Sequence, residues 1–409
     1  MVGRDAGAVV ADLVAGAVAR SAVPLVVPSQ VVAGPDEWSK IVGIGCWLLD
    51  AATDADPQQA LLHRAAFAWH AHFVTTLEKA FEWDTLWNAL TLLHRRAFSP
   101  FPTLAKEVSI DPAMLLFLDN AWNEKDAPQE NFARELMELF TLGRVDRDGR
   151  PTYAQADVVE MAKAWTGHGV TERPRTYRFS PDSAVGGTRL LFGQTGTWSG
   201  PPTIDVICSG PRRPVVARHV ARRLCTELWG RPPSTAALDR VAAAFETSGL
   251  DGAALFRAAL ADDELYDGPP ALRSPLAFMI ETQRVVGMRS GETHPEWYWE
   301  TMGQFPFGAP DVAGFRPATW GTEAAVWARA DWARNRLGWT ALERGWLADV
   351  PQLAPGAAVD AAASRYRLPL AASRPAIVDW LSRERAASGW GQAIGLHDLL
   401  CLSSEMNLQ

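Results

Sequence analysis

The sequence lacks the features that most readily place a protein in a functional class. It carries 39 basic and 47 acidic residues, so it has no basic surplus that would attract a nucleic acid. There are only four cysteines and none forms a C-x-x-C pair, which argues against a disulfide framework and a structural zinc site. No apolar run reaches the roughly 18 residues that a membrane span needs. Asp5 and Asp12 interrupt the apolar N-terminal residues, so we expect no signal peptide and a cytoplasmic location.

Common catalytic motifs are also missing. The sequence contains no P-loop, no dinucleotide-binding glycine motif, no G-x-S-x-G and no H-E-x-x-H. It has no Glu-x-x-His pair of the kind that helical bundles use to bind two metal ions. The cofactor is therefore unknown from motifs, and any divalent metal would have to be bound by scattered oxygen ligands.

Tryptophan, in contrast, is abundant, with 18 residues against five tyrosines. Seven of them lie close together in the C-terminal part, at Trp297, Trp299, Trp320, Trp327, Trp332, Trp339 and Trp346. The last three recur every seven residues, a spacing that on a continuous helix forms one stripe and more often marks core than binding surface. We interpret most tryptophans as core residues and a few as walls of a cleft.

Apolar residues at helical spacing predict a mainly α protein. We expect one compact multi-helix domain over residues 1–409, with helices that include 58–77, 84–97 and 126–143. Residues 168–210, rich in glycine, proline, threonine and serine, are expected to form an irregular insert with a small β-hairpin.

The segment E-N-F-A-R-E-L-M-E-L-F-T-L-G, residues 130–143, is the strongest candidate for chemistry. Asn131, Arg134, Glu135 and Glu138 follow an i, i+3, i+4, i+7 pattern, which places them on one face of an α-helix. The same pattern is typical of an amphipathic helix with a solvated face, whose ion pairs contribute only about 0.2–0.5 kcal/mol each. Both interpretations stay open.

Neighbouring segments add polar groups to this candidate. Asp119 and Asn120 precede the acidic helix, and Asp157 follows it. Grouped carboxylates repel one another unless a cation, an arginine or a shared proton relieves the repulsion. Glu135, Glu138 and Asp157 are therefore candidate ligands for Mg²⁺, Mn²⁺ or Ca²⁺. Alternatively, one carboxylate has its pKa raised by its neighbour and acts as a general acid or base.

Two further segments carry candidate residues. In F-A-W-H-A-H-F, residues 67–73, the two histidines lie on different sides of a helix, so His72 either faces the site or is a buried histidine bonded to the backbone. The loop at 303–321 is crowded with glycine and proline. Its Trp320 either lines a substrate pocket or packs over the core.

Three segments together resemble a known family. D-P-A-M-L-L-F-L-D-N-A-W-N, E-N-F-A-R-E-L-M-E-L-F-T-L-G and Y-A-Q-A-D-V-V-E-M-A-K-A-W-T-G are similar to segments of the bacterial domain-of-unknown-function 1800 family. The resemblance covers residues 8–345 and leaves 346–409 as a C-terminal extension. Family members are often exported, and gene neighbourhood in the family implies a protein partner encoded nearby. The family's His-Asp pair has no counterpart in S-P-D-S-A-V-G-G, residues 180–187.

We therefore expect an enzyme, a hydrolase with an acid-rich cleft between helices, with or without a divalent metal. Glu135 or Glu138 is the expected ligand or general base, His72 a proton-transfer group or ligand, and Arg134 an anion clamp. The expected substrate-binding residues are Asp119, Asn120, Asn131, Trp165 and Trp320. Two alternatives remain: a non-catalytic partner or assembly protein, and a tailoring or redox enzyme of specialised metabolism.

Overall fold

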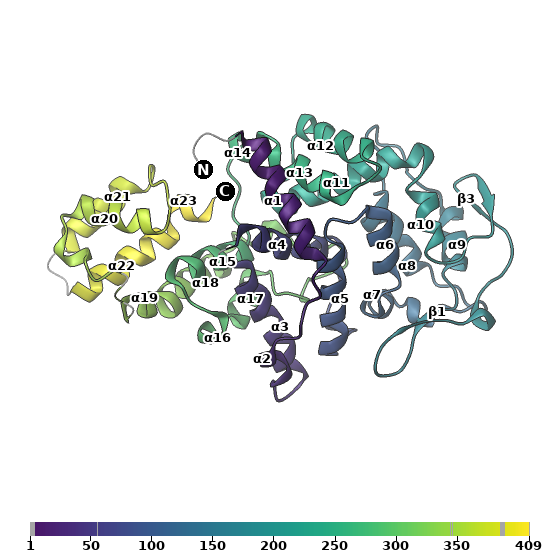
Figure 1. Cartoon of the computed structure of the whole chain (residues 1–409), viewed down its shortest axis with the longest axis horizontal. Coiled ribbons are helices and arrows are strands. Elements are labelled where there is room, and N and C mark those ends of the chain that lie inside the picture. The colour runs from purple at the N-terminus through teal and green to yellow at the C-terminus, as the bar shows by residue number, and fades with distance from the viewer. Residues whose placement is uncertain (1–4, 55, 344, 346, 385–388, 409) are drawn as a thin grey trace. The chain divides into compact units, whose positions relative to one another are not determined.

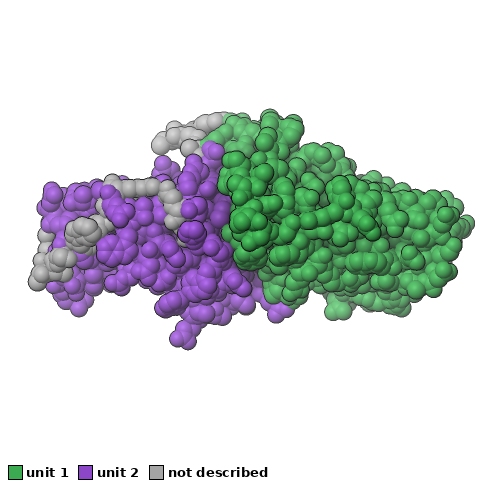
Figure 2. Space-filling model, turned by 90° about the horizontal axis from the view of Figure 1, so that it is seen from below, with its two compact units in different colours: residues 1–44, 56–268, 307–314 green, residues 45–55, 269–306, 315–409 purple. Residues whose placement is uncertain are grey.

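The computed structural model describes residues 5–54, 56–343, 345, 347–384 and 389–408. The chain is 63% helical, which confirms the predicted fold class (Figure 1). It folds into two compact units: unit 1 comprises residues 1–44, 56–268 and 307–314, and unit 2 comprises residues 45–55, 269–306 and 315–409 (Figure 2). The single domain expected from the sequence stays a prediction. Among the described residues, no helix combines the length and apolar character needed to cross a membrane.

Unit 1 carries most of the described helices and every candidate site residue except Trp320, which lies in unit 2. Its helices are α1 (Ala6–Ser21), α2 (Ser29–Val32), α4 (Pro57–His72), α5 (Trp83–Arg96), α6 (Phe101–Ser109), α7 (Pro112–Phe117), η1 (Asn120–Trp122), α8 (Glu130–Glu135), η2 (Leu136–Thr141), α9 (Gln155–Ala164), η3 (Pro181–Ser183), α10 (Pro202–Ile207), η4 (Gly210–Arg212), α11 (Arg213–Trp229), α12 (Thr235–Thr247), α13 (Gly252–Ala261) and α14 (Glu264–Asp267). Helix α3 (Glu37–Ala52) begins in unit 1 and ends in unit 2.

Unit 2 is built from shorter helices. They are α15 (Pro275–Val286), α16 (Ser290–Thr293), α17 (Glu296–Met302), η5 (Pro317–Thr319), α18 (Glu323–Asp331), η6 (Trp332–Gly338), α19 (Trp339–Glu343), η7 (Val350–Gln352), α20 (Pro355–Arg365), α21 (Arg374–Arg383), α22 (Gly389–Leu402) and α23 (Ser404–Asn407). Helix α22 packs against η6 and α21, and α17 packs against α18.

The insert at 168–210 contains two hairpins rather than one. Strand β1 (His168–Val170) pairs antiparallel with β2 (Tyr177–Phe179), with His168 opposite Phe179. Strand β3 (Arg189–Leu191) pairs with β4 (Gln194–Gly196). Each strand has only three residues, so the hairpins owe their position to packing against the helices, where β1 contacts α7 and β3 contacts α9.

Helix starts follow ordinary capping rules at some positions and not at others. Asp111 caps α7, because its carboxylate accepts the N–H of Ala113 at 2.9 Å. The helix expected to open at Asp126 begins instead at Glu130. Residues 124 and 127 form an isolated antiparallel bridge, so this stretch is paired as a turn and does not continue into the helix.

Aromatic side chains fill the core of unit 1. Trp69 of α4 is fully buried, and its ring lies 6.0 Å from those of Phe73, Phe101 and Phe256. These contacts join α4 to α6 and α13 and hold the C-terminal end of α4 in place. His72 is the last residue of α4, so this packing also fixes the position of its ring.

The tryptophans of unit 2 divide between core and surface. Trp299, Trp320 and Trp332 are fully buried, whereas Trp327 and Trp339 are about half exposed. The expected seven-residue stripe does not form one buried face, because the chain follows a π-helix from Trp332 to Gly338 and Trp339 then faces solvent. Trp346, the third member of the stripe, lies outside the described residues.

Candidate functional site

The acidic segment changes its helical geometry part-way along. Helix α8 ends at Glu135, and η2, a π-helix, continues from Leu136 to Thr141. A π-helix bonds each N–H to the carbonyl five residues earlier, and such turns are frequent at functional sites. Glu138 lies in this π turn and is only 8% exposed, whereas Asn131 on α8 is exposed. The four polar residues predicted on one helical face therefore differ in their access to solvent.

Two histidines from other helices stabilise the π turn. The carbonyl of Phe140 contacts Nε2 of His72 at 3.0 Å, and the carbonyl of Leu139 contacts Nε2 of His219 at 2.7 Å. A carbonyl oxygen only accepts hydrogen bonds, so each Nε2 carries the proton and donates it. Burial lowers the pKa of His72 well below its usual value and that of His219 to about 4, so both rings are neutral near pH 7.

Glu138 is surrounded by hydrogen-bond donors. Its Oε1 accepts a hydrogen bond from the Tyr153 hydroxyl, its Oε2 lies 2.9 Å from Nε of Arg144, and Nη1 of Arg134 lies 3.9 Å from Oε1. Burial, followed by the hydrogen bond to Glu138, raises the pKa of Tyr153 to about 12, so the tyrosine stays a neutral donor. The arrangement places hydrogen-bond donors on both oxygens of a nearly buried carboxyl group.

Glu135 occupies the opposite kind of environment. It lies three residues before Glu138 and is half-buried. Its carboxyl group makes no hydrogen bond or ion pair within the described residues. Burial raises its pKa first and the negative charge of Glu138 raises it further, while Arg134 and Arg144 oppose the shift. A carboxyl group of this kind keeps its proton to a higher pH than an ordinary glutamate.

A second polar contact joins α8 to the start of α9. Nη2 of Arg134 lies 2.9 Å from Oε2 of Glu130 and 3.2 Å from Oε1 of Gln155. Nε2 of Gln155 in turn donates to Glu130 at 2.9 Å. Arg134 is thus held by Glu130 on one side and approaches Glu138 on the other.

Asp157 does not join Glu135 and Glu138. Its Oδ2 accepts the N–H of Ala154 at 2.8 Å, and its Oδ1 accepts the N–H of Phe192 at 2.7 Å. The carboxylate therefore closes the N-terminus of α9 and holds the β3–β4 turn against it. Within the described residues, no three histidine, cysteine, aspartate or glutamate side chains form a group able to bind a metal ion.

The segments that carry this geometry lie within the part of the chain that matches a protein family. The family described as "Protein of unknown function (DUF1800)" matches residues 42–408. The chain belongs to the DUF1800 family. The DUF1800 match starts later than the resemblance at residue 8 indicated, and it includes most of the 346–409 segment that we set apart as an extension. No curated protein and no solved structure matches the chain, so the comparison supplies no reaction.

The segment D-N-A-W-N, residues 119–123, forms a cap for the end of α9. Nδ2 of Asn120 donates to the carbonyls of Trp165 and His168, and Nδ2 of Asn123 donates to the carbonyl of Ala162 at 3.1 Å. The carbonyls of Trp165 and Ala162 lie at the C-terminus of α9, where helical partners are missing. Both asparagines are almost fully buried, so their amides serve the backbone.

The remaining predicted residues are spread over the chain. Asp119 pairs with Nζ of Lys79 at 2.7 Å on the surface of unit 1, and Nδ2 of Asn131 donates to the carbonyl of Leu118 at 3.2 Å. Trp165 is fully buried and donates its Nε1 proton to Thr203 at 3.1 Å. Trp320 is fully buried in unit 2. Asp119, Asn131 and Trp165 thus have partners of their own in unit 1.

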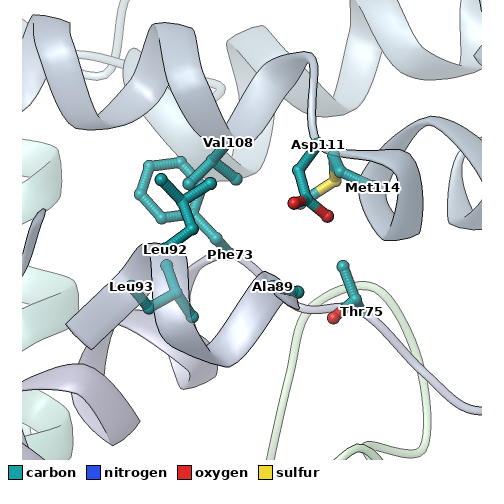
Figure 3. A pocket seen from close by; sticks show the side chains of 8 residues that line it. All are labelled: Phe73, Thr75, Ala89, Leu92, Leu93, Val108, Asp111 and Met114. Atoms are coloured by element: carbon teal, nitrogen blue, oxygen red, sulfur yellow. The ribbon is translucent and has the colours of Figure 1, made fainter. Parts of the chain in front are cut away.

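A small cavity lies beside α7 in unit 1. It measures about 10 Å³, close to the space that one water molecule occupies, so it is too small for a substrate. Asp111 and Met114 line one side of it and Thr75 and Ala89 the other, with Phe73 and Leu92 completing an apolar wall (Figure 3). Burial raises the pKa of Asp111 to about 7, against the opposing hydrogen bonds from the backbone of α7.

Three residues of the acidic site were not found from the sequence. Tyr153 and Arg144 lie in the connection between η2 and α9, where no helical spacing relates them to Glu138. Gln155 is the first residue of α9, and its side-chain amide contacts Arg134 and Glu130. A tyrosine and an arginine within a short connection beside an acidic helix are the only signal that the sequence offers for them.

Proposed function

We propose that the chain is a hydrolase in which Glu135 transfers protons at the acidic site of unit 1. The observation that carries the proposal is the contrast between two carboxyl groups three residues apart. Glu138 is paired with Arg144 and bonded by Tyr153, while the pKa of Glu135 is raised and its carboxyl has no partner among the described residues. Titratable neighbours whose environments push their pKa values apart are the usual arrangement of acid–base catalysts.

The roles of the two groups differ. Glu135 holds a proton to a higher pH than an ordinary glutamate, so it can donate that proton to a leaving group and then accept one from the attacking water. Glu138 does not exchange protons in this scheme. Its fixed charge raises the pKa of Glu135, and Tyr153 and Arg144 keep that charge in place.

Arg144 supplies a feature for substrate selection. Its side chain is 78% exposed although Nε contacts Glu138, so the two outer guanidinium nitrogens face solvent. A guanidinium group binds carboxylate and phosphate groups well. We therefore infer a substrate that carries an anionic group close to the bond that is hydrolysed.

The proposal is tested with chromogenic p-nitrophenyl substrates that carry an anionic group and are not carboxylic esters, namely a phosphate and a glucuronide. Glu135→Gln is expected to lower turnover of a substrate that the native protein hydrolyses by at least a hundredfold, because general acid–base catalysis contributes about 10²–10⁴-fold. Glu130→Gln is the matched control, since Glu130 lies on the same helix and is half-buried like Glu135 but pairs with Arg134. Full turnover by Glu135→Gln would contradict the proposal.

A non-catalytic role in assembly makes a different prediction for the same variants. If the acidic residues only hold α8, η2 and α9 together, Glu138→Gln lowers the melting temperature because it loosens Tyr153 and Arg144. Glu135→Gln then has no effect beyond a small change in stability. Native turnover in Glu135→Gln, together with a lowered melting temperature in Glu138→Gln, thus favours assembly over catalysis.

A further inference from the structure

A serine, a histidine and a tyrosine lie in hydrogen-bond reach of one another at the other end of α9. His168 is the first residue of β1, Tyr177 the first of β2, and Ser199 lies between β4 and α10. Nδ1 of His168 is 2.8 Å from the Tyr177 hydroxyl, and Nε2 is 3.2 Å from the Ser199 hydroxyl. The His168 ring is buried, and neither of these contacts joins it to the acidic helices.

The His168 ring is held firmly by its surroundings. Its centroid lies 5.2 Å from the ring of Trp165 and 4.7 Å from that of Phe179. Gly200 approaches the ring so closely that a Cβ at this position would lie 2.2 Å from Cε1 of the imidazole. Gly200 also has φ +58°, a left-handed conformation that favours glycine. Both the close approach to the ring and the backbone conformation therefore require glycine directly after Ser199.

We propose that Ser199 is a nucleophile for acyl transfer from esters, with His168 as its general base and Tyr177 as the residue that positions the base. This geometry matches the general pattern of an activated nucleophile: a hydroxyl within reach of a base whose far side is oriented by a third group. The site is independent of Glu135 and Glu138. It does not rest on the proposed function.

The arrangement of protons follows from this assignment. The Tyr177 oxygen accepts the proton of Nδ1, which leaves the lone pair of Nε2 directed at the Ser199 hydroxyl. Burial lowers the pKa of His168 to about 4, so the ring is neutral and able to accept a proton near pH 7. Tyr177 and Ser199 are both half-buried, so neither residue is sealed off from the surface.

The chemical step balances without a further reactant except water. The Ser199 oxygen forms a bond to the ester carbonyl carbon while its proton moves to Nε2 of His168, and the carbonyl electron pair moves onto oxygen. Collapse of this intermediate breaks the bond to the alcohol, which leaves with the proton from His168. Water then hydrolyses the acyl-serine by the same route. The backbone N–H of Ser199 donates to no group within the described residues and is available to the oxyanion.

The first test is covalent labelling of the full chain by a fluorophosphonate, with the modified residue identified by peptide mass spectrometry. We expect the label on Ser199, none at that position in Ser199→Ala, and at least a tenfold slower reaction of Ser199 in His168→Gln. Ser180→Ala is the matched control, because Ser180 is half-buried in the same insert but its hydroxyl bonds to that of another serine. Ser199 left unmodified in the folded native protein would overturn the proposal.

The second test reads the imidazole directly, because His168→Gln can fail to fold. In ¹⁵N-histidine spectra of the native chain, we expect the proton of His168 on Nδ1, and in Tyr177→Phe we expect it to redistribute toward Nε2 while labelling of Ser199 slows. A proton on Nε2 in the native protein would overturn the assignment of His168 as base. Glu135→Gln should label at the native rate, which separates this site from the acidic one.

Discussion

A methyl group on Gly143 would lie 2.6 Å from Nδ1 of His219, the ring whose Nε2 donates to the carbonyl of Leu139. Gly143 also has φ +75°, which suits a residue that ends a helix in the left-handed conformation. The glycine therefore serves two purposes at once. It turns the chain after η2, and it leaves room for the histidine that stabilises the π turn carrying Glu138.

Gly143→Ala should therefore destabilise the protein more than backbone conformation alone explains. Gly149→Ala is the matched control, because Gly149 has φ +79° but has open space where its Cβ would lie. We expect about 1–2 kcal/mol from the left-handed conformation in both variants. Gly143→Ala should lose about a further 1–3 kcal/mol, since the His219 bond to Leu139 is displaced. Urea unfolding measures both, and equal losses would show that the contact with His219 is unimportant.

Asp111 should make the native protein less stable as the pH rises from about 4 to about 7. Burial raises its pKa from 3.8 to about 7 in the folded state, so the folded chain binds the proton more tightly than the unfolded chain in this range. Stability then falls with rising pH by up to about 1.4 kcal/mol per pH unit. Asp111→Asn removes the titration and keeps a good N-cap, so it should be more stable than the native protein at pH 8 and similar at pH 4.

The control for this experiment is Asp251→Asn, which alters another N-cap of unit 1. Asp251 accepts the N–H of Ala254 at 2.7 Å but is half exposed. Its replacement measures how much a change of N-cap residue alone alters the free energy of unfolding. A pH-independent difference between Asp111→Asn and the native protein would contradict the buried-acid interpretation.

The protein should lose stability steeply on acidification below about pH 6.5. Burial lowers the pKa of seven of the eight histidines, namely His63, His70, His72, His94, His168, His219 and His397. The unfolded chain therefore binds more protons than the folded chain between the ordinary pKa of 6.5 and the lowered values near 4.

Three buried acids oppose this effect over the same range. Burial raises the pKa of Asp111, Glu227 and Asp398 to about 7, so they favour the folded state as the pH falls. With seven histidines and three acids acting in opposite directions, the unfolded chain binds about four more protons than the folded chain. The free energy of unfolding then changes by at most about 5 kcal/mol per pH unit. Urea unfolding from pH 7 to pH 4.5 measures the slope. His63→Gln should reduce this slope by about one proton. An unchanged stability at pH 4.5 would contradict the account.

Sequence reasoning found the helices and the two carboxylates but not the environment that distinguishes them. The apolar spacing of residues 130–143 fits an α-helix, and that spacing does not predict the π turn that begins at Leu136. The turn depends on His72 and His219, which lie on α4 and α11 and are far from it in sequence. Local periodicity carries no information about such long-range partners.

The candidates Asn120 and Asp157 also show what local sequence patterns cannot predict. Asn120 and Asp157 belong to segments rich in polar residues, and such segments suggest a binding site. In the structure, their polar atoms bond to backbone groups at the ends of α9, which are unpaired by the nature of a helix terminus. A sequence shows which residues are able to bind, whereas the backbone groups that compete for them appear only in three dimensions.

The most direct test of the acidic site is the pKa of Glu135, measured by ¹³C-carboxyl NMR titration in the native protein and in Glu138→Gln. We predict a native pKa above the ordinary 4.5, because burial and the charge of Glu138 both raise it. In Glu138→Gln the pKa should fall, since the negative charge is gone and Arg134 and Arg144 then act on Glu135 unopposed. An ordinary pKa in the native protein, or the same raised value in both proteins, would contradict the coupling on which the proposed acid–base role depends.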